Sequence, residues 1–421
     1  MQKIMLTTDK MDIIPEKWYN IIPDLPEPLS PPRDNNRDSS SIDLLNRIIP
    51  KEVLRQEFTV RRFEPIPQEV IEGYEQIGRP TPLIRARNME RALDYGGKIF
   101  LKFEGATVTG SHKINTALPQ AYYAKNEGIG SVVTETGAGQ WGTATALASS
   151  LYGMKSKIFM VRTSYDQKPL RKQIMSLYGA DVSASPSSET EFGRRILSSD
   201  PRHLGTLGIA ISEAVEYALK NDARYMLGSV MNSVVTHQSV IGLETRKQLE
   251  IAGEYPDAMI GCVGGGSNFS GFTFPFIPDG DDIEYIASTA EEVPKFTHGT
   301  YKYDFIDTAG ILPSLRMYSL GADFVPPGIY AGGLRYHGAA PTLSMLIKLG
   351  KIRAEDVSQA EVIDALRFFA NHQGIVAAPE SGHAIASAMR YANLHRTEKK
   401  TIVVNISGHG LMDMKIFDGE K

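Results

Sequence analysis

The chain has 421 residues, of which 42% are hydrophobic and 22% are charged, a length that allows two or three domains with large buried cores. A net charge of -4 implies no basic surface, so we expect no nucleic-acid partner. The single cysteine, Cys262, excludes an internal disulfide framework, and no apolar run is long enough to cross a bilayer. Acidic residues interrupt the opening segment where a signal peptide would be apolar, so we expect a cytoplasmic protein with no membrane partner.

The N-terminal part of the chain differs in pattern from the rest. Residues 1 to about 50 are rich in proline and show no periodicity, so we expect an arm there. The charged stretches 49–62 and 67–77 are expected to be helical. We therefore assign residues 1–77 to an N-terminal arm with helices.

From about residue 79 onward, strand patterns alternate with helical patterns of about 10 to 15 residues, which indicates parallel α/β sheets. The expected strands are 98–104, 131–135, 156–161, 180–185, 258–263, 283–288 and 401–407. The expected helices are 140–153, 168–179, 234–252, 358–373 and 382–393. We predict two α/β domains with a ligand cleft between them. One is an N-terminal domain over 112–232 with a mobile substrate-closing region, and the other is a C-terminal domain over 78–111 and 233–421.

Three polar or glycine-rich loops follow expected strands, at 135–142, 264–268 and 407–410. Ligands of open α/β sheets bind beyond the carboxyl ends of the strands, so these loops together predict a ligand site. The first loop contains G-x-G-x-x-G from Gly137 to Gly142, the phosphate loop of dinucleotide-binding proteins. That fingerprint also needs an acid about 20 residues later, where the next strand ends in Arg162 instead. An arginine could suit NADP, and a structural turn is the plain alternative.

The second loop follows a buried strand and reads CVGGGSNF. The backbone N–H groups of three consecutive glycines can converge on an anion, and the serine and asparagine can add side-chain donors. The pattern predicts a cup for one phosphate group, with a simple tight turn as the alternative. The residues of this phosphate cup are Gly264, Gly265, Gly266, Ser267 and Asn268.

Two further features suggest a bound aromatic aldehyde. Lys113, in TGSHKIN, is expected at the start of a helix, where burial and the positive helix end would lower its pKa. Such a lysine can bind the aldehyde of a cofactor, although most lysines are solvated surface residues. His112 beside it is either a packed or surface histidine or a phosphate contact. Ser407 ends a buried strand, where it either caps the next turn or directs its hydroxyl at a ring heteroatom.

A lysine for an aldehyde, a separate cup for one phosphate and a polar group facing a ring are what pyridoxal 5′-phosphate needs. A dinucleotide would explain only the first loop. We expect no metal ligands, because the sequence has neither H-E-x-x-H nor clustered Cys and His. The absence of a G-x-S-x-G elbow argues against a serine hydrolase.

The motifs RPTPLIRA, TGSHKIN, ETGAGQWG, CVGGGSN, GLRYHG, PESGHA and SGHG occur in the order typical of one family. Over residues 78–413 the chain resembles the tryptophan synthase β chain, and its ETGAGQWG and AGGLRYHG are similar to the type-2 form. This resemblance implies a two-domain fold type II pyridoxal-phosphate enzyme, with a mostly parallel sheet flanked by helices in each domain and the cofactor in the interdomain cleft. It also implies a lyase that joins L-serine, or O-phospho-L-serine, to indole. A homodimer, a weakly bound α subunit and a monovalent cation (K+ or Na+) held by backbone carbonyls belong to the same expectation.

The resemblance further implies roles for individual residues. Lys113 binds the cofactor and later moves the Cα proton, Glu135 is the acid/base residue, and Asp323 closes on the substrate. The implied cofactor contacts are Lys113, His112, Asn115, Gly264, Gly265, Gly266, Ser267, Asn268, Glu380 and Ser407. The implied contacts to the substrate carboxylate are Thr136, Gly137, Ala138, Gly139, Gln140 and Trp141.

A serine at the ring nitrogen does not hold that nitrogen protonated as an aspartate would, which favours elimination and replacement over transamination. Glu135 shuttles a proton in a closed site, so we expect burial to raise its pKa. The chain departs from the family at Thr289 and Ala290, where Glu-Pro is usual, and at His409, where the familiar form has arginine. Two alternatives stay open. One is another fold type II enzyme such as a serine/threonine dehydratase or a cysteine synthase, and the other is an NAD(P)-binding oxidoreductase that uses Gly137 to Gly142.

Overall fold

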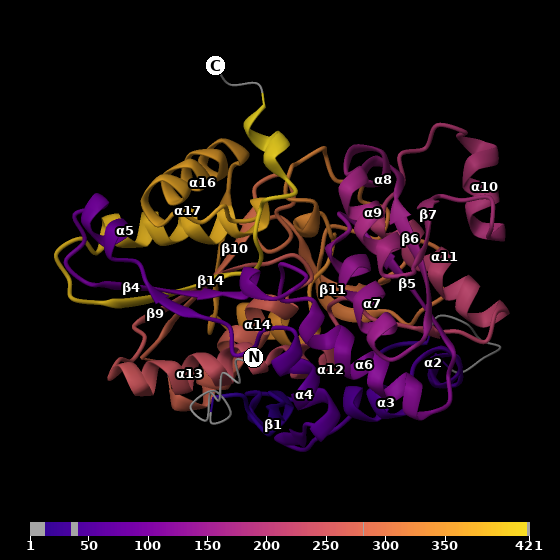
Figure 1. Cartoon of the computed structure of the whole chain (residues 1–421), viewed down its shortest axis with the longest axis horizontal. Helices are drawn as coiled ribbons and strands as arrows, with labels where there is room; N and C mark the ends of the chain where they lie inside the picture. Colours follow the sequence, from indigo (N-terminus) through magenta and orange to yellow (C-terminus); the bar gives the residue numbers. More distant parts are fainter. Residues whose placement is uncertain (1–12, 35–40, 281, 419–421) are drawn as a thin grey trace, which may run out of the picture.

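The computed structural model describes residues 13–34, 41–280 and 282–418, and two main β-sheets lie side by side in it (Figure 1). The smaller sheet has four parallel strands in the order β7-β6-β5-β8. The larger sheet has six strands in the order β13-β10-β9-β14-β4-β3, and only the edge strand β3 is antiparallel to its neighbour. Helices cover both sheets, as expected for parallel α/β architecture.

All seven expected strands are present, and their ends lie within two residues of the predicted ones. The smaller sheet consists of β5 (Ser131–Thr136), β6 (Lys155–Val161), β7 (Asp181–Ser185) and β8 (Arg224–Tyr225). The larger sheet consists of β3 (Leu83–Arg85), β4 (Lys98–Phe103), β9 (Ala258–Cys262), β10 (Glu284–Ala290), β13 (Arg353–Val357) and β14 (Thr401–Ile406). Two antiparallel pairs were not predicted: β1 (Lys17–Tyr19) with β2 (Phe63–Pro65), and β11 (Thr300–Asp304) with β12 (Leu315–Ser319).

The helices lie between the strands along the chain. In chain order they are α2 (Ser41–Ile48), α3 (Lys51–Glu57), α4 (Gln68–Gln76), α5 (Arg87–Ala92), α6 (Ile114–Asn126), α7 (Gln140–Leu151), α8 (Arg162–Gln167), α9 (Pro169–Leu177), α10 (Glu191–Ser199), α11 (Leu207–Lys220), α12 (Asn232–Gln238), α13 (Val240–Ala252), α14 (Ser267–Thr273), α15 (Pro341–Lys348), α16 (Gln359–Gln373) and α17 (Pro379–Leu394). Short 3-10 turns are η1 (Ile22–Asp24), η2 (Glu104–Ala106), η3 (Phe274–Asp279), η4 (Gly332–Leu334) and η5 (Met414–Phe417).

Two helix predictions were wrong in extent. The helix expected over 49–62 ends at Glu57, and the chain then enters strand β2. The helix expected over 234–252 is divided at Ser239, whose N–H forms a tighter bond to the Thr236 carbonyl. By contrast, α16 matches its prediction because Ser358 and Glu361 form a capping box at its start.

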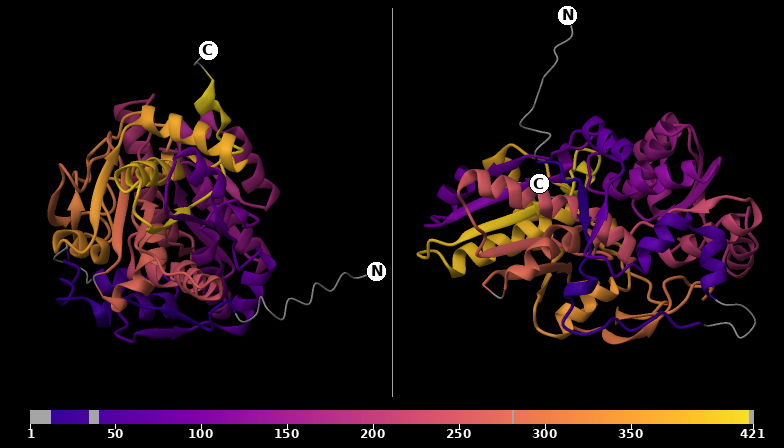
Figure 2. Two further views of the ribbon diagram at one scale, coloured as in Figure 1. Left: turned by 90° about the vertical axis from the view of Figure 1, so that its left-hand side faces the viewer. Right: turned by 90° about the horizontal axis from the view of Figure 1, so that it is seen from below.

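The N-terminal arm is packed onto the protein rather than irregular throughout. Trp18 is completely buried, and its indole N–H donates a hydrogen bond of 3.1 Å to the hydroxyl of Tyr74 on α4. Figures 1 and 2 (left) show this indigo segment along the lower edge of the molecule. Residues 1–12 and 35–40 of the predicted arm lie outside the described residues.

The two sheets place the predicted loops at their strand ends: β5 ends at Thr136, β9 at Cys262 and β14 at Ile406. The strands of the smaller sheet all fall within 112–232, and those of the larger sheet fall within 78–111 and 233–421. The division into folding domains at these boundaries stays a prediction. Among the described helices, none has the length and apolar character needed to cross a membrane.

Candidate active site

Residues from all three predicted loops line one cavity with a volume of about 230 Å³. The predicted site residues that line it are His112, Lys113, Glu135, Thr136, Gly137, Ala138, Gln140, Trp141, Gly264, Gly265, Gly266, Ser267, Asn268, Glu380 and Ser407. Three predicted residues, Asn115, Gly139 and Asp323, are not part of the lining. Parallel strands from two different sheets therefore deliver these loops to a common space.

Lys113 immediately precedes α6, as predicted, and its side chain reaches the cavity. Burial lowers the pKa of its ammonium, while Glu380, Cys262 and Glu135 act in the opposite direction. A lysine with a lowered pKa provides more free amine near neutral pH, and a free amine is the form that attacks an aldehyde.

The phosphate cup has donors available and no room for side chains. No hydrogen bond within the described part of the chain uses the N–H of Gly264, Gly265 or Gly266. A Cβ atom on these glycines would lie 2.2, 2.3 and 2.7 Å, respectively, from Gly333 O, Ser229 Oγ and Leu343 Cδ2. Open backbone donors in a loop that tolerates only glycine fit a phosphate group.

The Asn268 side chain is anchored at the base of the cup through its amide oxygen. Its Oδ1 accepts a hydrogen bond of 3.0 Å from Asn405 Nδ2, and its Nδ2 lies 3.5 Å from the Cys262 carbonyl. These contacts link the start of α14 to β9 and β14. The predicted contact of Asn268 with the cofactor stays a prediction, and the backbone donors and the Ser267 hydroxyl are the open donors of the cup.

Ser407, at the end of β14, contacts a second hydroxyl and the only thiol of the chain. Its Oγ lies 2.9 Å from Ser381 Oγ and accepts a hydrogen bond of 3.4 Å from Cys262 Sγ. The Ser407 carbonyl in turn accepts the backbone N–H of His112 at 3.0 Å, which joins the lysine loop to the third loop. Burial lowers the pKa of His112 to about 3, so His112 is neutral and offers no charge to an anion.

Glu135, at the end of β5, is buried and shares a short contact with Tyr225 of β8. The Tyr225 hydroxyl donates to Glu135 Oε2 at 2.5 Å. Burial raises the pKa of Glu135 to about 7, even though the bond from Tyr225 acts to lower it. A carboxyl group that titrates near neutral pH can both give and take a proton, as an acid/base residue must.

The loop after β5 presents backbone rather than side-chain donors. The indole N–H of Trp141 donates to Thr134 Oγ1 at 2.7 Å, and the Gln140 amide donates to Glu380 Oε1 at 3.1 Å. Thr136 Oγ1 accepts the N–H of Gly139 at 3.2 Å, and the positive φ of Gly139 turns the chain into α7. The N–H of Gly142 in the first turn of this helix also donates to Thr136 Oγ1, at 3.1 Å, so the N–H groups of Gln140 and Trp141 remain for a carboxylate.

The structure offers no support for a dinucleotide at the loop after β5. Arg162, the residue that could have suited NADP, donates to the Pro186 carbonyl and does not line the cavity.

Asp323 is exposed in the segment before Val325, and its predicted role in closing on the substrate stays a prediction. No group of metal-ligating side chains occurs among the described residues.

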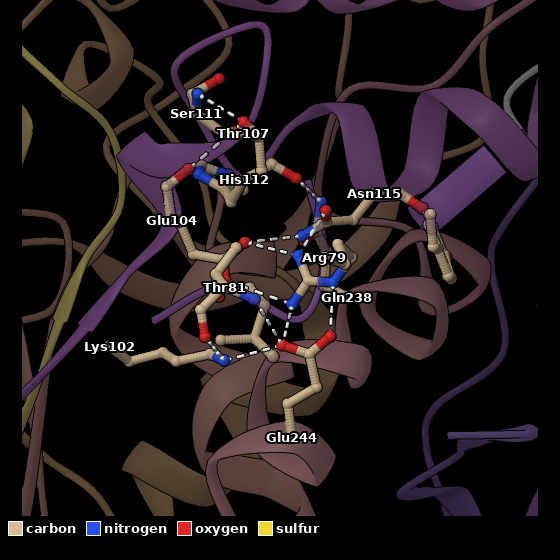
Figure 3. A network of polar contacts seen from close by, with 12 residues as sticks. Arg79, Thr81, Lys102, Glu104, Thr107, Ser111, His112, Asn115, Gln238 and Glu244 are labelled. Carbon is tan, nitrogen blue, oxygen red and sulfur yellow. Dashed lines mark hydrogen bonds and ion pairs between the residues drawn. The ribbon is translucent and has the colours of Figure 1, made fainter. Parts of the chain in front are cut away.

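Asn115 lies behind the cavity wall, in a buried ion network around Arg79 (Figure 3). Its amide oxygen accepts from Arg79 at 2.7 Å, and its amide nitrogen donates to Glu104 at 2.9 Å and to Gln238 at 3.1 Å. Gln238 then donates to the His112 carbonyl at 3.2 Å, next to Lys113. Asn115 thus contacts the support of the lysine loop instead of the cavity.

The network balances two cations against two anions with no exposed side chain. Arg79 bonds Glu104 at 2.9 Å and Glu244 at 2.8 Å, and Lys102 bonds Glu244 at 2.7 Å. Burial alone would raise the pKa of Glu104, but Arg79 and Lys102 outweigh it and hold the value at about 2. These groups are saturated with partners and are unavailable for chemistry.

The sequence reasoning assigned no role to three residues that the site uses: Tyr225, Ser381 and Arg335, which lines the cavity and lies inside the quoted motif GLRYHG. Tyr225 contacts Glu135 across 90 positions of the chain, and Ser381 contacts Ser407 across 26. Ser381 lies inside the quoted motif PESGHA, which was the available signal, whereas nothing near Tyr225 marked it.

Comparisons with known proteins agree with this geometry. The family described as "Pyridoxal-phosphate dependent enzyme" matches residues 74–408. The "Tryptophan synthase beta chain" of Picrophilus torridus is 68% identical over 96% of this chain and 97% of that protein. "Tryptophan synthase beta chain 1" of Sulfurisphaera tokodaii is 59% identical over 96% of each chain. The solved structure of maize serine racemase has a TM-score of 0.58, 18% identity and coverage of 80% of this chain and 93% of that chain, a likeness of fold alone.

Proposed function

Because the chain belongs to the tryptophan synthase β chain family of pyridoxal-phosphate dependent enzymes, we propose that it joins L-serine or O-phospho-L-serine to indole and forms L-tryptophan. The observation that carries this proposal is the shared cavity, in which the lysine, the phosphate cup and a carboxyl group of raised pKa meet. Pyridoxal phosphate, when bound, supplies an aldehyde for amines and a ring that accepts electrons.

Each part of the cofactor has a residue suited to it. The open N–H groups of Gly264, Gly265 and Gly266 would hold the phosphate. Lys113 would bind the aldehyde and, as a free amine, would move the Cα proton of the substrate. The Ser407 hydroxyl, which contacts Ser381 and Cys262, would face the ring nitrogen.

Glu135 is the acid/base residue for the leaving group and for indole, whereas Lys113 moves the Cα proton. In its protonated form it donates to the departing serine hydroxyl, and in its charged form it takes a proton when indole attacks. Tyr225 holds Glu135 Oε2 by its hydroxyl, which fixes the carboxyl group toward the substrate and stabilises the charged form. The backbone donors at the start of α7 bind the substrate carboxylate.

The cavity also contains a cation suited to a phosphorylated donor. Arg335 lines the cavity, and its guanidinium donates to the Ile329 carbonyl. A phosphate ester leaves more easily than a hydroxyl, and a guanidinium can bind it. We therefore expect Arg335→Met to impair the use of O-phospho-L-serine more than the use of L-serine.

Further proposals concern assembly and location. We propose a homodimer in the cytoplasm, which receives indole either from solution or from a weakly bound α subunit. Size-exclusion chromatography with light scattering, alone and with an α subunit present, tests both associations.

A direct assay tests the proposed reaction. Protein, pyridoxal phosphate and indole are mixed with L-serine or O-phospho-L-serine, and tryptophan is measured by chromatography. We expect tryptophan with at least one donor and none with Lys113→Ala. Pyruvate and ammonia without tryptophan would instead indicate a dehydratase, and binding of NADPH by a colourless protein would contradict the cofactor assignment.

A further inference from the structure

Lys295 is a buried lysine next to the phosphate cup, and none of the roles described above uses it. Lys295 is 0% exposed to solvent, and its ammonium donates a hydrogen bond of 2.9 Å to the Gly264 carbonyl oxygen. No ion pair to Lys295 occurs among the described residues. Asp356 favours its charge from a distance, but the Asp356 carboxylate is hydrogen-bonded to the hydroxyls of Thr289 and Thr297.

A buried ammonium without an ion pair is unfavourable unless another negative group compensates it. Burial lowers the pKa of Lys295 to about 7, against the smaller influence of Asp356. His337 is also nearby and is neutral, because burial lowers its pKa too. The residues around Lys295 thus leave its charge uncompensated, while the adjoining cup is built for an anion.

The hydrogen bond from Lys295 also fixes the direction of a peptide group. In a trans peptide, the carbonyl of one residue and the N–H of the next point in opposite directions. Lys295 does not line the cavity, so it holds the Gly264 carbonyl on the outer side of the loop. The N–H of Gly265 consequently faces the cup.

The next peptide is held in the same way by a neutral group. The N–H of Ala340 donates to the Gly265 carbonyl at 2.8 Å, which directs the N–H of Gly266 inward. On the other flank, the Gly333 carbonyl would lie only 2.2 Å from a Cβ atom at Gly264. Hydrogen bonds to the Gly264 and Gly265 carbonyls thus hold the loop on its outer side, and Lys295 is the only charged donor of the two.

We propose that Lys295 is a positioning residue of the phosphate cup and that a bound phosphate group favours its charged form. Its ammonium aims the Gly265 N–H at the phosphate and supplies the positive charge that a free monovalent cation on backbone carbonyls would otherwise supply. An ammonium on a lysine and a potassium ion are both compact single charges that bind carbonyl oxygen. This inference rests on the proposed assignment of the cofactor phosphate to Gly264–Asn268.

Binding of the cofactor by the apoprotein tests the proposal without catalysis. Titrations use pyridoxal 5′-phosphate, pyridoxal without phosphate, and inorganic phosphate, in tetramethylammonium buffer and with added KCl or NH4Cl. For Lys295→Ala we expect affinity for pyridoxal 5′-phosphate and inorganic phosphate to fall by about 10- to 100-fold, the loss of one charged hydrogen bond. Affinity for pyridoxal should be unchanged, and K+ or NH4+ should restore part of the loss. Lys302→Met, which removes an exposed lysine, is the matched control and should bind like the natural protein.

Two results would overturn the inference. One is a Lys295→Ala protein that binds both phosphate ligands as tightly as the natural protein. The other needs no variant: strong stimulation of cofactor binding by K+ in the natural protein would mean that Lys295 does not replace a free cation. Gly265→Ala tests the assignment of the phosphate site independently of Lys295. Its added Cβ would lie 2.3 Å from Ser229 Oγ, so it should disturb the cup and weaken cofactor binding if the phosphate binds there. If Gly265→Ala binds the cofactor normally, the phosphate site lies elsewhere.

Discussion

The ion network around Arg79 (Figure 3) and the cavity around Lys113 both enclose ionisable groups. Asn115 and Gln238 connect the network to the His112 carbonyl, next to Lys113. In the network, every charge has an opposite charge at hydrogen-bonding distance. In the cavity, Lys113 is partly buried and Glu135 is buried, they form no mutual ion pair, and their pKa values move toward neutrality. Burial alone therefore does not mark a functional group; burial without a compensating partner does.

The largest expected effect on activity comes from replacing Lys113 in the cavity. Lys113→Ala removes both the amine that binds the cofactor and the base for the Cα proton, so tryptophan formation should fall by about 10⁴-fold or more. The matched control Lys125→Ala, at the other end of α6, should retain full activity. Steady-state assays decide this, and a modest loss in Lys113→Ala would contradict the assigned role.

Replacement of the buried carboxyl should have the next largest effect. Glu135→Gln keeps the shape of the side chain but cannot exchange a proton, so kcat should fall by about 10²- to 10³-fold. Cofactor binding, followed by visible absorbance, should be retained. If kcat is unchanged, Glu135 is only a packed carboxyl group.

Substitutions in the ion network around Arg79 should lower the stability of the protein rather than change its catalytic chemistry. Arg79→Met leaves two buried carboxylates short of a partner, so the free energy of unfolding should fall by about 3–5 kcal/mol. Arg62→Met removes an exposed pair with Asp24 and should cost less than about 1 kcal/mol. Denaturant titration measures both, and equal losses would remove the distinction between the two regions.

The smallest expected effect is a shift in pH dependence. The bond from Tyr225 stabilises the charged form of Glu135, so its removal in Tyr225→Phe should raise the Glu135 pKa above about 7. The limb of the pH–kcat profile that reports Glu135 should move to higher pH by about one unit, the equivalent of one hydrogen bond. A limb that moves to lower pH, or stays in place, would show that Tyr225 does not tune this carboxyl group.

The sequence predicted the features that are local in the chain. Glycines after a buried strand, a lysine before a helix and a serine at a strand end each carry their meaning within a few residues. The rule that parallel strands present their carboxyl ends together then placed the three loops at one site, and the cavity confirms that placement.

The features that the sequence did not predict depend on long-range contacts or on direction. The pairs of Tyr225 with Glu135 and of Lys295 with Gly264 join separate elements of the chain. Asn115 matched a motif, yet two helical positions from Lys113 correspond to about 200° of rotation, so its side chain faces the opposite way. The proline-rich composition of the arm likewise hid the burial of Trp18, because packing against α4 overrides local irregularity.

Mapping the lysine that binds the cofactor tests the central claim most directly. The protein is incubated with pyridoxal phosphate, reduced with borohydride, digested and analysed by peptide mass spectrometry. Lys113 should carry the cofactor mass, while Lys102, paired with Glu244, and Lys295, bound to the Gly264 carbonyl, should not. Stoichiometric label on either of those lysines, or no label on Lys113, would contradict the account.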